Sequence, residues 1–593
     1  MDDQNKNLIL ATALSFLVIL VWFVLFPPPE PVPETTPAQV TSEEPGLTTP
    51  RAESGTPTTP DSQVAPESVE AAADAPRLTI DTPRLIGSIS LRGGRIDDLR
   101  LTDYRETVDA SSPTIVLFSP KGAPAPYYAD FGVTADPGAD VALPQATTVW
   151  TAEEGAKLTP QSPVTLTWDN GAGLVFERVI SIDADYMFTV EQRVRNETGE
   201  TVQLYPYGLI VRNGTPHTEG FYILHEGLIG VFGETGLSEI DYEDVQEDGR
   251  VRPAAVSTGW LGITDKYWAS ALIPAQGNGF QPQFSYAQAT DNFQADFLGD
   301  PIRVEAGASA TSTTHLFAGA KETAKLDAYE ENLGIKQFEL LIDWGWFYFL
   351  TKPLFFVIDY LFKVVGNFGV AILLVTVAIK TLFFPLANKS YVSMSKMKLV
   401  QPQMTEIRDR YKDDKQKQQQ ALMELYKKEK INPLAGCLPI LIQIPVFFAL
   451  YKVLFVTIEM RHAPFFGWIQ DLSAPDPTSL FNLFGLIPWD PPQMLMLGIW
   501  PLIMGVTMFV QMKMNPAPPD PTQQMIFTWM PVLFTFMLAS FPAGLVIYWA
   551  WNNSLSIAQQ YVIMRRQGVK VELWDNLKGS FSRKKGEADS KSK

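Results

Sequence analysis

The most restrictive feature of the sequence is an apolar stretch, residues 369–387 (GVAILLVTVAIKTLFFPLA), that carries a lysine well inside it. A membrane-spanning helix needs about 20 apolar residues, so this stretch has the length and composition of a span. Lys380 would lie roughly 16 Å along the helix from residue 369. A lysine at bilayer depth costs about 3 to more than 10 kcal/mol, so its presence requires an explanation.

Two explanations for Lys380 are open from the sequence. The side chain could extend toward the headgroups beyond residue 387, keeping only its stem in the apolar layer. Alternatively, the lysine lies on the wall of a water-filled cavity within the membrane. Thr376, one turn earlier on the same helix face, favours the second interpretation.

Other apolar stretches predict five more spans. Residues 8–26 end in a proline run without a small-residue cleavage site, which predicts an uncleaved amino-terminal anchor. Further along, the expected helices are 434–458, 494–513, 524–540 and 545–564. The last two come from one long stretch that Pro542 and Gly544 interrupt. The first of this pair would measure only about 24 Å, which predicts a thinned bilayer or a polar cavity beside it.

The distribution of charged residues among the loops predicts how the protein is oriented in the membrane. Residues 388–432 contain eleven basic and six acidic residues, a net charge of +5, so the positive-inside rule places this loop in the cytoplasm. Residues 459–492 carry one firm positive charge, Arg461, and are expected outside. Six spans then leave both termini, including the basic tail 567–593, in the cytoplasm.

The loop 388–432 has a helical pattern. Met397, Val400, Met404, Ile407 and Tyr411 recur at spacings of three and four. Asp413-Asp414 can cap a second helix, and the two patterns together predict a helical hairpin. A run of charge is ordinarily a solvated face. The net charge would also suit RNA or anionic lipid.

Between the apolar stretches 8–26 and 369–387, the composition is that of an exported soluble domain. Residues 27–75 contain no aromatic residue and predict a disordered linker. Residues 76–335 show short alternating runs separated by turn signals such as Asn170-Gly171 and Asn213-Gly214, which predict a large β sandwich, with a helix over 321–333. We interpret this domain as a binding or spacer module. A sugar-active enzyme of the same fold would need converging carboxylates.

Residues 336–365 combine an aromatic cluster with Asp343, Lys352 and Asp359. A span would have to bury those charges, whereas a helix at the membrane surface would not. Aromatic side chains favour that depth, so we predict an interfacial amphipathic helix.

Polar side chains follow the last predicted span toward its cytoplasmic end. Tyr548 and Trp549 are followed by Asn552, Asn553 and Ser556. Such a face is costly against lipid and is explained if it lines the cavity of Lys380. The single cysteine, Cys437, excludes an intrachain disulfide, and the four histidines lack metal-ligand spacing, so no metal or cofactor is expected.

Five stretches resemble the YidC/Oxa/Alb family of membrane protein insertases. They are GNFGVAILLVTVAIKTLFFPL, SKMKLVQPQMTEIRDRYKDDKQK, KINPLAGCLPILIQIPVFFALY, MGVTMFV and FPAGLVIYW, in the family's order over residues 366–566. GWLGITDKYWASALIP is similar, more weakly, to the large periplasmic domain of the Gram-negative type. The resemblance implies a polytopic α-helical membrane protein of six transmembrane helices, five of them forming the insertase core, with a periplasmic β sandwich. It also implies the bacterial inner membrane and a function other than enzymatic catalysis.

In that family, a groove open to cytoplasm and lipid accepts hydrophobic segments of new proteins. The resemblance places the groove's positive residue, often arginine, at Lys380, with walls that include Thr376, Gln443 and Trp549, the last a tyrosine in some members. Tyr548 and Asn553 complete the expected groove. Nascent membrane proteins, the Sec translocon, the ribosome and membrane lipids are the implied partners. The basic residues expected to contact the ribosome or another partner are Lys396, Lys398, Arg408, Arg410, Lys412, Lys415, Lys417, Arg565 and Arg566.

Two other classes of function compete with insertion. A small-anion transporter or channel could use Lys380 as its binding site, but the sequence shows no inverted repeat and no paired broken helices. An envelope enzyme acting through the β domain would need a site that the linear sequence does not display.

Overall fold

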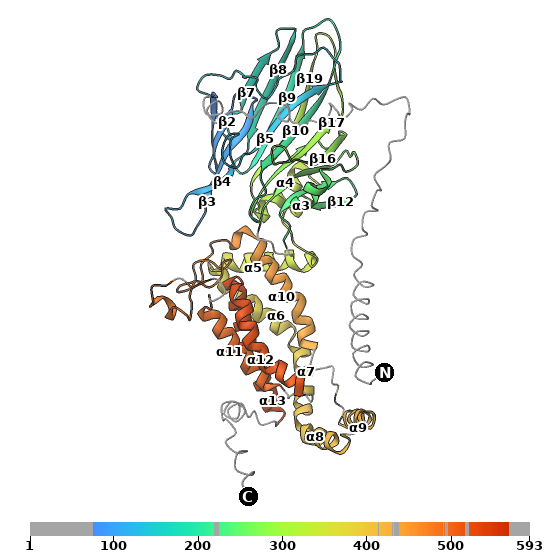
Figure 1. The fold of residues 1–593 in the computed structure, drawn as a ribbon, viewed down its shortest axis with the longest axis vertical. Coiled ribbons are helices and arrows are strands. Elements are labelled where there is room, and N and C mark those ends of the chain that lie inside the picture. Colours follow the sequence, from blue (N-terminus) through green and yellow to red (C-terminus); the bar gives the residue numbers. More distant parts are fainter. Residues whose placement is uncertain are drawn as a thin grey trace.

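The structure is a computed structural model that describes residues 75–218, 224–412, 414–429, 431, 438–489, 491–492, 496–515 and 521–568. The predicted anchor 1–26, the predicted linker up to residue 74, and the basic tail from residue 569 onward lie outside the described residues. Figure 1 shows a β-rich part at one end of the molecule and a helical part at the other. Helix α5 (Tyr348–Val365) lies across the junction between them.

The β-rich part contains two sheets. Eleven strands form the larger sheet, in the order β13-β16-β17-β10-β5-β3-β2-β1-β6 with β18 beside β10 and β4 beside β3, and eight form the smaller, in the order β12-β11-β14-β15-β19-β9-β8-β7. The larger sheet consists of β1 (Arg77–Asp81), β2 (Leu85–Ser90), β3 (Arg95–Arg105), β4 (Thr114–Phe118), β5 (Tyr127–Ala135), β6 (Lys157–Leu158), β10 (Val202–Asn213), β13 (Arg250–Val251), β16 (Phe280–Ala287), β17 (Asn292–Gly299) and β18 (Ile302–Val304). The smaller consists of β7 (Val164–Asp169), β8 (Leu174–Ile182), β9 (Met187–Asn196), β11 (Gly227–Phe232), β12 (Gly236–Ile240), β14 (Gly259–Thr264), β15 (Trp268–Pro274) and β19 (Ser309–Ala320). The predicted β sandwich is confirmed.

Alternation along the strands explains the two layers. In β9, Phe188, Val190 and Val194 are buried, whereas the intervening Arg193 and Arg195 face solvent. Period-two burial of this kind gives one face to the core and the other to water. The central pairs are antiparallel, as in β10 with β5 and β17, and β9 with β8 and β19.

The predicted turn at Asn170-Gly171 joins β7 to β8. Asn170 Oδ1 accepts hydrogen bonds from the backbone N–H groups of Ala172 (2.8 Å) and Leu174 (3.0 Å). Gly171 adopts φ 69°, a conformation that glycine reaches without steric cost. This turn therefore follows directly from local sequence.

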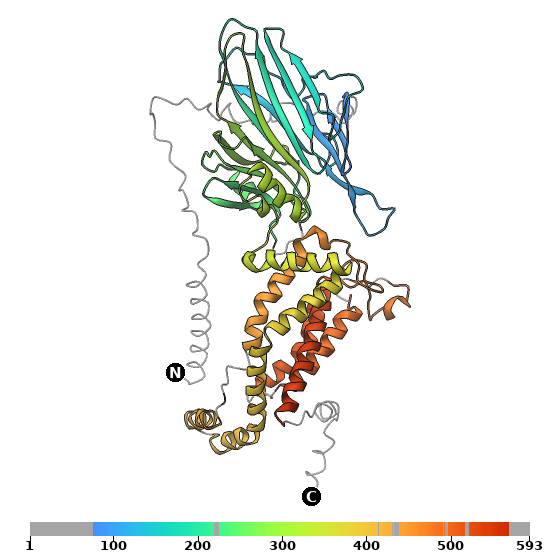
Figure 2. The ribbon, with the colours of Figure 1, turned by 180° about the vertical axis from the view of Figure 1, so that it is seen from behind.

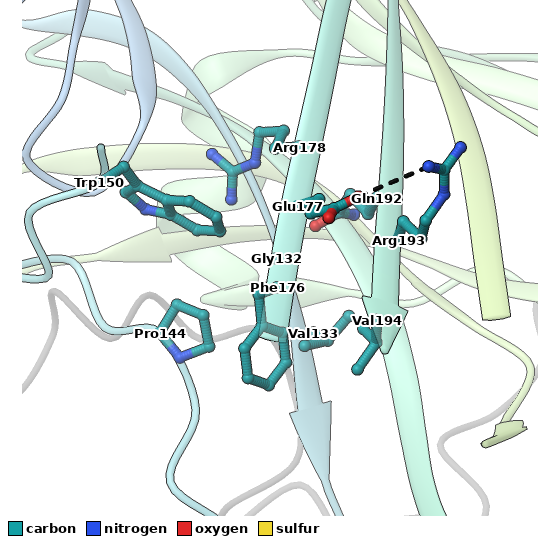
Figure 3. A pocket seen from close by; sticks show the side chains of 10 residues that line it. All are labelled: Gly132, Val133, Pro144, Trp150, Phe176, Glu177, Arg178, Gln192, Arg193 and Val194. Atoms are coloured by element: carbon teal, nitrogen blue, oxygen red, sulfur yellow. Dashed lines mark hydrogen bonds and ion pairs between the residues drawn. The ribbon is translucent and has the colours of Figure 1, made fainter. Parts of the chain in front are cut away.

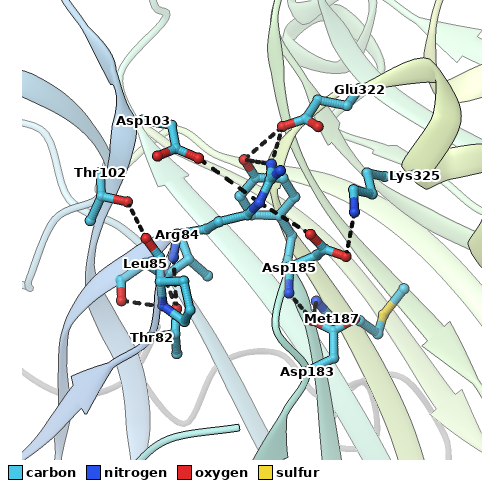
Figure 4. Close-up of polar contacts among 12 residues, drawn as sticks. Thr82, Arg84, Leu85, Thr102, Asp103, Asp183, Asp185, Met187, Glu322 and Lys325 are labelled. Atoms are coloured by element: carbon cyan, nitrogen blue, oxygen red, sulfur yellow. Dashed lines mark hydrogen bonds and ion pairs between the residues drawn. The ribbon is translucent and has the colours of Figure 1, made fainter.

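A charged cluster fixes the start of α4 (Thr323–Leu333), the helix expected over 321–333, against the sandwich (Figure 4). Arg84 Nε lies 3.1 Å from Asp185 Oδ1, and the same guanidinium bonds Glu322. Asp185 also pairs with Lys325 Nζ at 2.8 Å. Glu322 additionally accepts the hydroxyl of Tyr186 at 2.9 Å. Each charge in the cluster thus has an opposite charge beside it.

Helix α5 is amphipathic, with its charged side chains bonded to neighbouring polar groups. Lys352 Nζ lies 2.9 Å from Asp327 of α4 and also bonds Glu339 of the short helix η2 (Phe338–Leu341). Asp359 pairs with Lys363 on α5 itself at 2.7 Å. Large apolar side chains on and just before the helix remain exposed: Trp346, Phe349, Phe356, Val357 and Tyr360.

The helical part is built around the carboxy-terminal helix α13 (Ala543–Arg566), which contacts α6, α7, α10 and α11. The other helices are α6 (Phe368–Leu382), α7 (Phe384–Leu399), α8 (Gln401–Arg410), α9 (Lys415–Lys428), α10 (Leu438–Val456), α11 (Ile499–Met514) and α12 (Pro521–Met537). A short helix η7 (Leu538–Ser540) follows α12, and the chain breaks at Phe541–Pro542 before α13. Among the described residues, no single helix is long and apolar enough to cross a bilayer, whereas α6 and α7 together meet that length and hydropathy.

The helical course expected over 369–387 is not straight. Helix α6 ends at Leu382, and α7 leaves it at an angle of 67°. Pro385 lies in the first turn of α7, where it has no N–H to continue the α6 ladder and its ring clashes with the preceding turn. Lys380 therefore lies in the last turn of α6, just before a bend.

Polar contacts join the sandwich to the end of the bundle. Glu459, in the short helix η4 (Ile458–Met460), accepts a 2.9 Å hydrogen bond from the Thr323 N–H at the start of α4. Burial raises the pKa of the Glu459 carboxyl to about 7. Lys452 of α10 lies 2.7 Å from Asp343 Oδ2. The first contact ties the end of α10 to α4, and the second ties α10 to the segment that precedes α5.

Candidate functional site

Lys380 lies between α6 and α13. Its side chain is half-buried, and its Nζ donates a 2.7 Å hydrogen bond to Ser556 Oγ of α13. Ser556 in turn donates to the Asn552 carbonyl at 2.8 Å. Among the described residues, no carboxylate lies within ion-pairing distance of Lys380. The lysine is thus held by a neutral hydroxyl, which leaves its charge uncompensated.

Thr376 does not join Lys380 in this arrangement. It is buried, and its hydroxyl donates to the Ile372 carbonyl of its own helix at 2.7 Å. That back-bond satisfies the hydroxyl within α6. The structure therefore places Thr376 on the packed side of the helix, one turn from the lysine.

A second polar contact joins α10 to α13. Gln443 Nε2 donates to the hydroxyl of Tyr548, which is almost completely buried. One residue further on, the ring of Trp549 stacks on Phe447 with centroids 4.6 Å apart. Gln443, Tyr548 and Trp549 are therefore brought together, as a contact between the two helices.

Farther along α13, two amides bond α11 and the residue that follows it. Asn553 Nδ2 donates to Thr507 Oγ1 at 3.4 Å, and Gln560 Nε2 donates to Asn515 Oδ1 at 3.0 Å. Tyr548, Asn552, Ser556 and Gln560 recur every four residues, so they form one row along the helix. We call these four residues the polar row.

The polar row is not fully satisfied. Asn552 Oδ1 and Gln560 Oε1 are buried and have no hydrogen-bond partner among the described residues. A buried acceptor without a donor costs about 1–3 kcal/mol. Both oxygens are closed off from solvent in this arrangement, so water or a bound chain would reach them only after these side chains move.

From the sequence, Ser556 was expected on the polar face beside Lys380, and the structure joins the two by a hydrogen bond. Thr507 opposite Asn553 and Asn515 opposite Gln560 were not singled out. The four-residue period of the polar row was a visible signal for one functional face on α13. The neighbouring helix that each member meets is fixed only by tertiary packing.

The hairpin lies at the end of the bundle away from the sandwich (Figure 1). Val400, Met404, Leu425 and Ile431 form its small core, with Met397 and Ile407 packed against it. The predicted seam is therefore confirmed for Met397 to Ile407, whereas Tyr411 does not belong to this core. Asp414 caps α9 by accepting the Lys417 N–H at 3.0 Å, as the sequence predicts.

The basic residues expected to contact partners lie on and around this hairpin. Lys396 and Lys398 end α7, and Arg408 and Arg410 end α8. Lys412, Lys415 and Lys417 follow along the turn and α9, and Arg565 and Arg566 end α13. Of these, Arg410 pairs with Glu406 at 2.6 Å and Lys417 with Asp414 at 3.1 Å.

A small pocket in the sandwich is the other candidate site (Figure 3). Arg178 lies at its wall, 4.8 Å from the centre of the Trp150 ring, and donates to the Gly94 carbonyl at 2.8 Å. The carboxylates near the pocket are held by arginines: Glu177 by Arg193 at 3.5 Å, and Asp130 by Arg178 at 3.8 Å. No group of three metal-ligating side chains occurs within the part of the chain that the structure describes. The pocket thus offers packing and paired charges rather than a converging acid and base.

In a membrane protein, an ionisable side chain inside an apolar helical bundle marks a functional site such as a substrate or ion pathway. Two family models match this chain: the YidC periplasmic domain over residues 77–357, and the 60Kd inner membrane protein over residues 360–570. The membrane protein insertase YidC of Methylobacterium radiotolerans is 56% identical over 615 residues, which cover 99% of each chain. That of Mesorhizobium japonicum is 55% identical over 603 residues, which cover 99% of this chain and 100% of the relative.

A solved structure of an active YidC insertase with its first transmembrane domain resolved covers 82% of this chain and 94% of its own, at 17% identity and a TM-score of 0.35. The sequence relationships, which run over the full length, show that the chain belongs to the YidC family of membrane protein insertases. It is an inner-membrane insertase with a periplasmic β domain, and the family's function is insertion rather than enzymatic catalysis.

Proposed function

We propose that this insertase accepts the polar outer segment of a new membrane protein in a hydrated groove between α6, α10, α11 and α13. One observation carries the proposal: Lys380 faces a neutral hydroxyl, without a carboxylate among the described residues. Gln443, Tyr548, Trp549 and Asn553 line the groove beside it. Thr376 supports the groove from the packed side of α6.

The chemistry follows from the uncompensated charge. An acidic outer segment that leaves the cytoplasm loses hydration, and Lys380 offsets part of that cost by Coulomb attraction. When the helices part to admit the segment, the two buried acceptors of the polar row that have no partner receive hydrogen bonds from the segment's backbone N–H groups. The apolar helix of the substrate then moves into lipid, which contributes about 25 cal/mol per Å² of buried apolar surface.

Hydrophobic transfer drives this process. The sequence contains no GxxxxGK[ST] motif for a nucleotide. The membrane potential adds about 2.3 kcal/mol per elementary charge at 100 mV, which aids movement of an acidic segment outward.

The topology that fits this function has six spans: the anchor 8–26 and five core spans over 369–387, 434–458, 494–513, 524–540 and 545–564. The hairpin 388–432, the tail 567–593 and both termini lie in the cytoplasm. The sandwich 76–335 and its linker 27–75 lie in the periplasm, and residues 336–365 lie at the membrane surface. The separation of the basic hairpin and the sandwich to opposite ends of the molecule supports this arrangement (Figure 1).

The ribosome and the Sec translocon are the partners proposed for nascent chains. Among the described residues, no ion pair compensates Lys396, Lys398, Arg408, Lys412 or Lys415. These side chains, with Arg565 and Arg566 nearby in the proposed cytoplasmic region, offer cations to ribosomal RNA phosphates. The proposal that the Sec translocon is a partner is based on the resemblance of the sequence to the insertase family. Lipid surrounds the apolar faces of the core.

A site-specific photo-crosslinker tests the groove. We place it at Gln559, which is half-buried on α13 three residues after Ser556. The matched control is Val108, an exposed position on the sandwich. Ribosome-bound nascent membrane protein should crosslink at position 559 and not at 108. Equal crosslinking at both positions, or at neither, would contradict the groove.

A further inference from the structure

The connection between α10 and α11 presents an apolar surface that the insertion groove does not use. Residues 465–489, which we call the apolar loop, expose large side chains at many positions, and Leu486 is 83% exposed. Those side chains are Phe466, Trp468, Leu480, Phe481, Leu483, Phe484, Leu486, Ile487 and Trp489. Apolar exposure on this scale marks an interaction surface rather than scattered surface residues.

The apolar loop is folded around a buried carboxylate. Asp476 is 2% exposed, and its Oδ1 accepts from Trp468 Nε1 at 3.1 Å and from the Thr478 N–H at 3.0 Å. Its Oδ2 accepts from the Trp500 N–H at 2.9 Å, in the first turn of α11. A carboxylate at a helix amino terminus is favoured by the helix dipole. Asp476 therefore ties the loop to the start of α11.

Backbone hydrogen bonds fix the base of the loop to two other helices. The N–H groups of Ala543 and Gly544, at the start of α13, donate to Ala474 O (2.7 Å) and Leu472 O (2.9 Å). Asn367, at the corner between α5 and α6, donates through Nδ2 to Phe465 O at 3.1 Å. The loop therefore keeps a defined place beside the bundle while its apolar side chains remain exposed.

The apolar loop lies beside the bundle at the same height as helix α5. In Figures 1 and 2, which view the molecule from opposite sides, the loop projects from the bundle just beyond one end of α5. Both segments lie at the sandwich end of the bundle, and both expose aromatic side chains. Tryptophan and other aromatic residues favour the boundary between headgroups and acyl chains.

We propose that the apolar loop is a second interfacial anchor, which inserts Leu486, Ile487 and their exposed neighbours into the outer leaflet of the membrane. Residues 477–489 contain no charged side chain, so no charge has to be desolvated on insertion. The loop is already ordered by Asp476, so little conformational freedom is lost. With α5, it holds the outer end of the bundle at one depth. This inference rests on the proposed topology, which places residues 336–365 at the membrane surface, and it goes beyond the proposed groove.

Spin labelling of the full-length protein in phosphatidylcholine–phosphatidylglycerol vesicles tests the anchor. A nitroxide is attached at Leu486→Cys in a Cys437→Ser background; the side chain is exposed, so the label displaces no core packing. Its collisions with oxygen, which concentrates in lipid, and with a water-soluble nickel chelate are measured. Labels at Glu154→Cys on the sandwich and Leu533→Cys on α12 give the aqueous and apolar references.

We expect the ratio of oxygen to nickel collisions at position 486 to exceed that at 154 several-fold. Adding Ile487→Asp should lower the ratio toward the aqueous reference, whereas the size-matched Ile487→Leu should leave it unchanged. A ratio at 486 equal to that at 154, with position 533 still apolar, would overturn the anchor and leave the groove untouched. A label that is dry in native membranes but wet in the vesicles would show that a protein covers the loop, and would also overturn it.

Discussion

The sandwich and the bundle both bury cations, and they treat them differently. In the sandwich, Arg178 bonds the Gly94 carbonyl, stacks on Trp150 and lies 3.8 Å from Asp130. Arg212 lies 2.6 Å from Asp265. In the bundle, the hydrogen-bond partner of Lys380 is one neutral hydroxyl, that of Ser556. These buried cations of the sandwich are compensated, and so is Lys452 of the bundle beside Asp343, whereas Lys380 has no counter-charge among the described residues.

A buried lysine of the sandwich makes the contrast closest. Lys321 is 1% exposed and, like Lys380, donates to a hydroxyl, Thr264 Oγ1 at 3.0 Å. Burial lowers the pKa of Lys321 to about 8, although the carboxylates of Asp265 and Asp343 act to raise it. No such carboxylate acts on Lys380 among the described residues. A hydroxyl partner alone does not mark a functional lysine, and the missing counter-charge does.

The largest expected effect comes from removing a compensated cation. Arg178→Leu leaves Asp130 and several carbonyls buried without their partner, so we expect a loss of about 3–5 kcal/mol in the free energy of unfolding. Lys380→Leu removes an uncompensated charge and should leave stability equal or higher while it impairs insertion. Thermal unfolding in detergent and insertion assays at matched protein levels measure the two effects. If both substitutions destabilised the protein to a similar extent, the proposed difference between the compensated Arg178 and the uncompensated Lys380 would be contradicted.

The next effect is a pH dependence within the sandwich. Asp296 is fully buried, and burial raises the pKa of its carboxyl from 3.8 to about 7. Asp296 Oδ1 and Gln283 Oε1 both lack a hydrogen-bond partner among the described residues. Protonation of the Asp296 carboxyl would turn one of these two acceptors into a donor. The folded state therefore binds more protons than the unfolded state between about pH 4 and pH 7.

The contribution of Asp296 to the stability of the sandwich should accordingly be complete below about pH 4 and be lost as the pH rises toward 7, by at most about 1.4 kcal/mol per pH unit. Asp296→Asn should abolish this fall, because an amide keeps the contacts without titrating. Hydrogen exchange of the β17 amides, corrected for intrinsic rates, measures it in the full-length protein, and Asp300→Asn on the surface is the matched control. An unchanged slope in Asp296→Asn would exclude this carboxyl as its source.

A smaller expected effect, on the free energy of unfolding, tests whether the amides of the polar row serve insertion or stabilise the fold. Asn552→Leu removes an acceptor that has no partner among the described residues, so we expect about 1 kcal/mol of added stability together with weaker insertion. Asn213→Leu in the sandwich is the contrasting control, since Asn213 Nδ2 donates to Thr290 O at 2.7 Å and its loss should only destabilise. Loss of stability in Asn552→Leu would mean that the amide is structural.

Local patterns predicted the elements better than their arrangement. Period-two alternation gave the sandwich, the Met397–Val400–Met404 spacing gave the hairpin seam, and Pro542 marked the break before α13. These signals lie within one or two turns of chain. The order of strands, in which β5 lies beside β10, depends on contacts between distant residues and has no local signature.

The candidate site shows the same limit. Lys380 was conspicuous because a lysine in an apolar stretch is costly, but its acceptor, Ser556, lies 176 residues away. Thr376 shares a helix face with Lys380 by spacing, yet its hydroxyl bonds its own backbone. Spacing identifies which residues can share a face, and packing decides which of them meet.

The central claim is that the charge of Lys380 acts on the substrate. Like charges about 4 Å apart at an effective dielectric near 20 repel by roughly 4 kcal/mol, so Lys380→Glu should oppose an acidic segment directly. Lys380→Arg keeps the charge and should be tolerated. Substrates with neutral or basic outer segments should suffer less, which separates an electrostatic role from misfolding.

The most direct measurement is protease protection of two substrates that differ only in the acidic residues of their outer segments, in cells with matched levels of the parent insertase or of Lys380→Glu. We predict that Lys380→Glu strongly reduces insertion of the acidic substrate and affects its neutral counterpart much less. Equal insertion of both substrates by the variant and the parent would show that this charge does not act on the substrate.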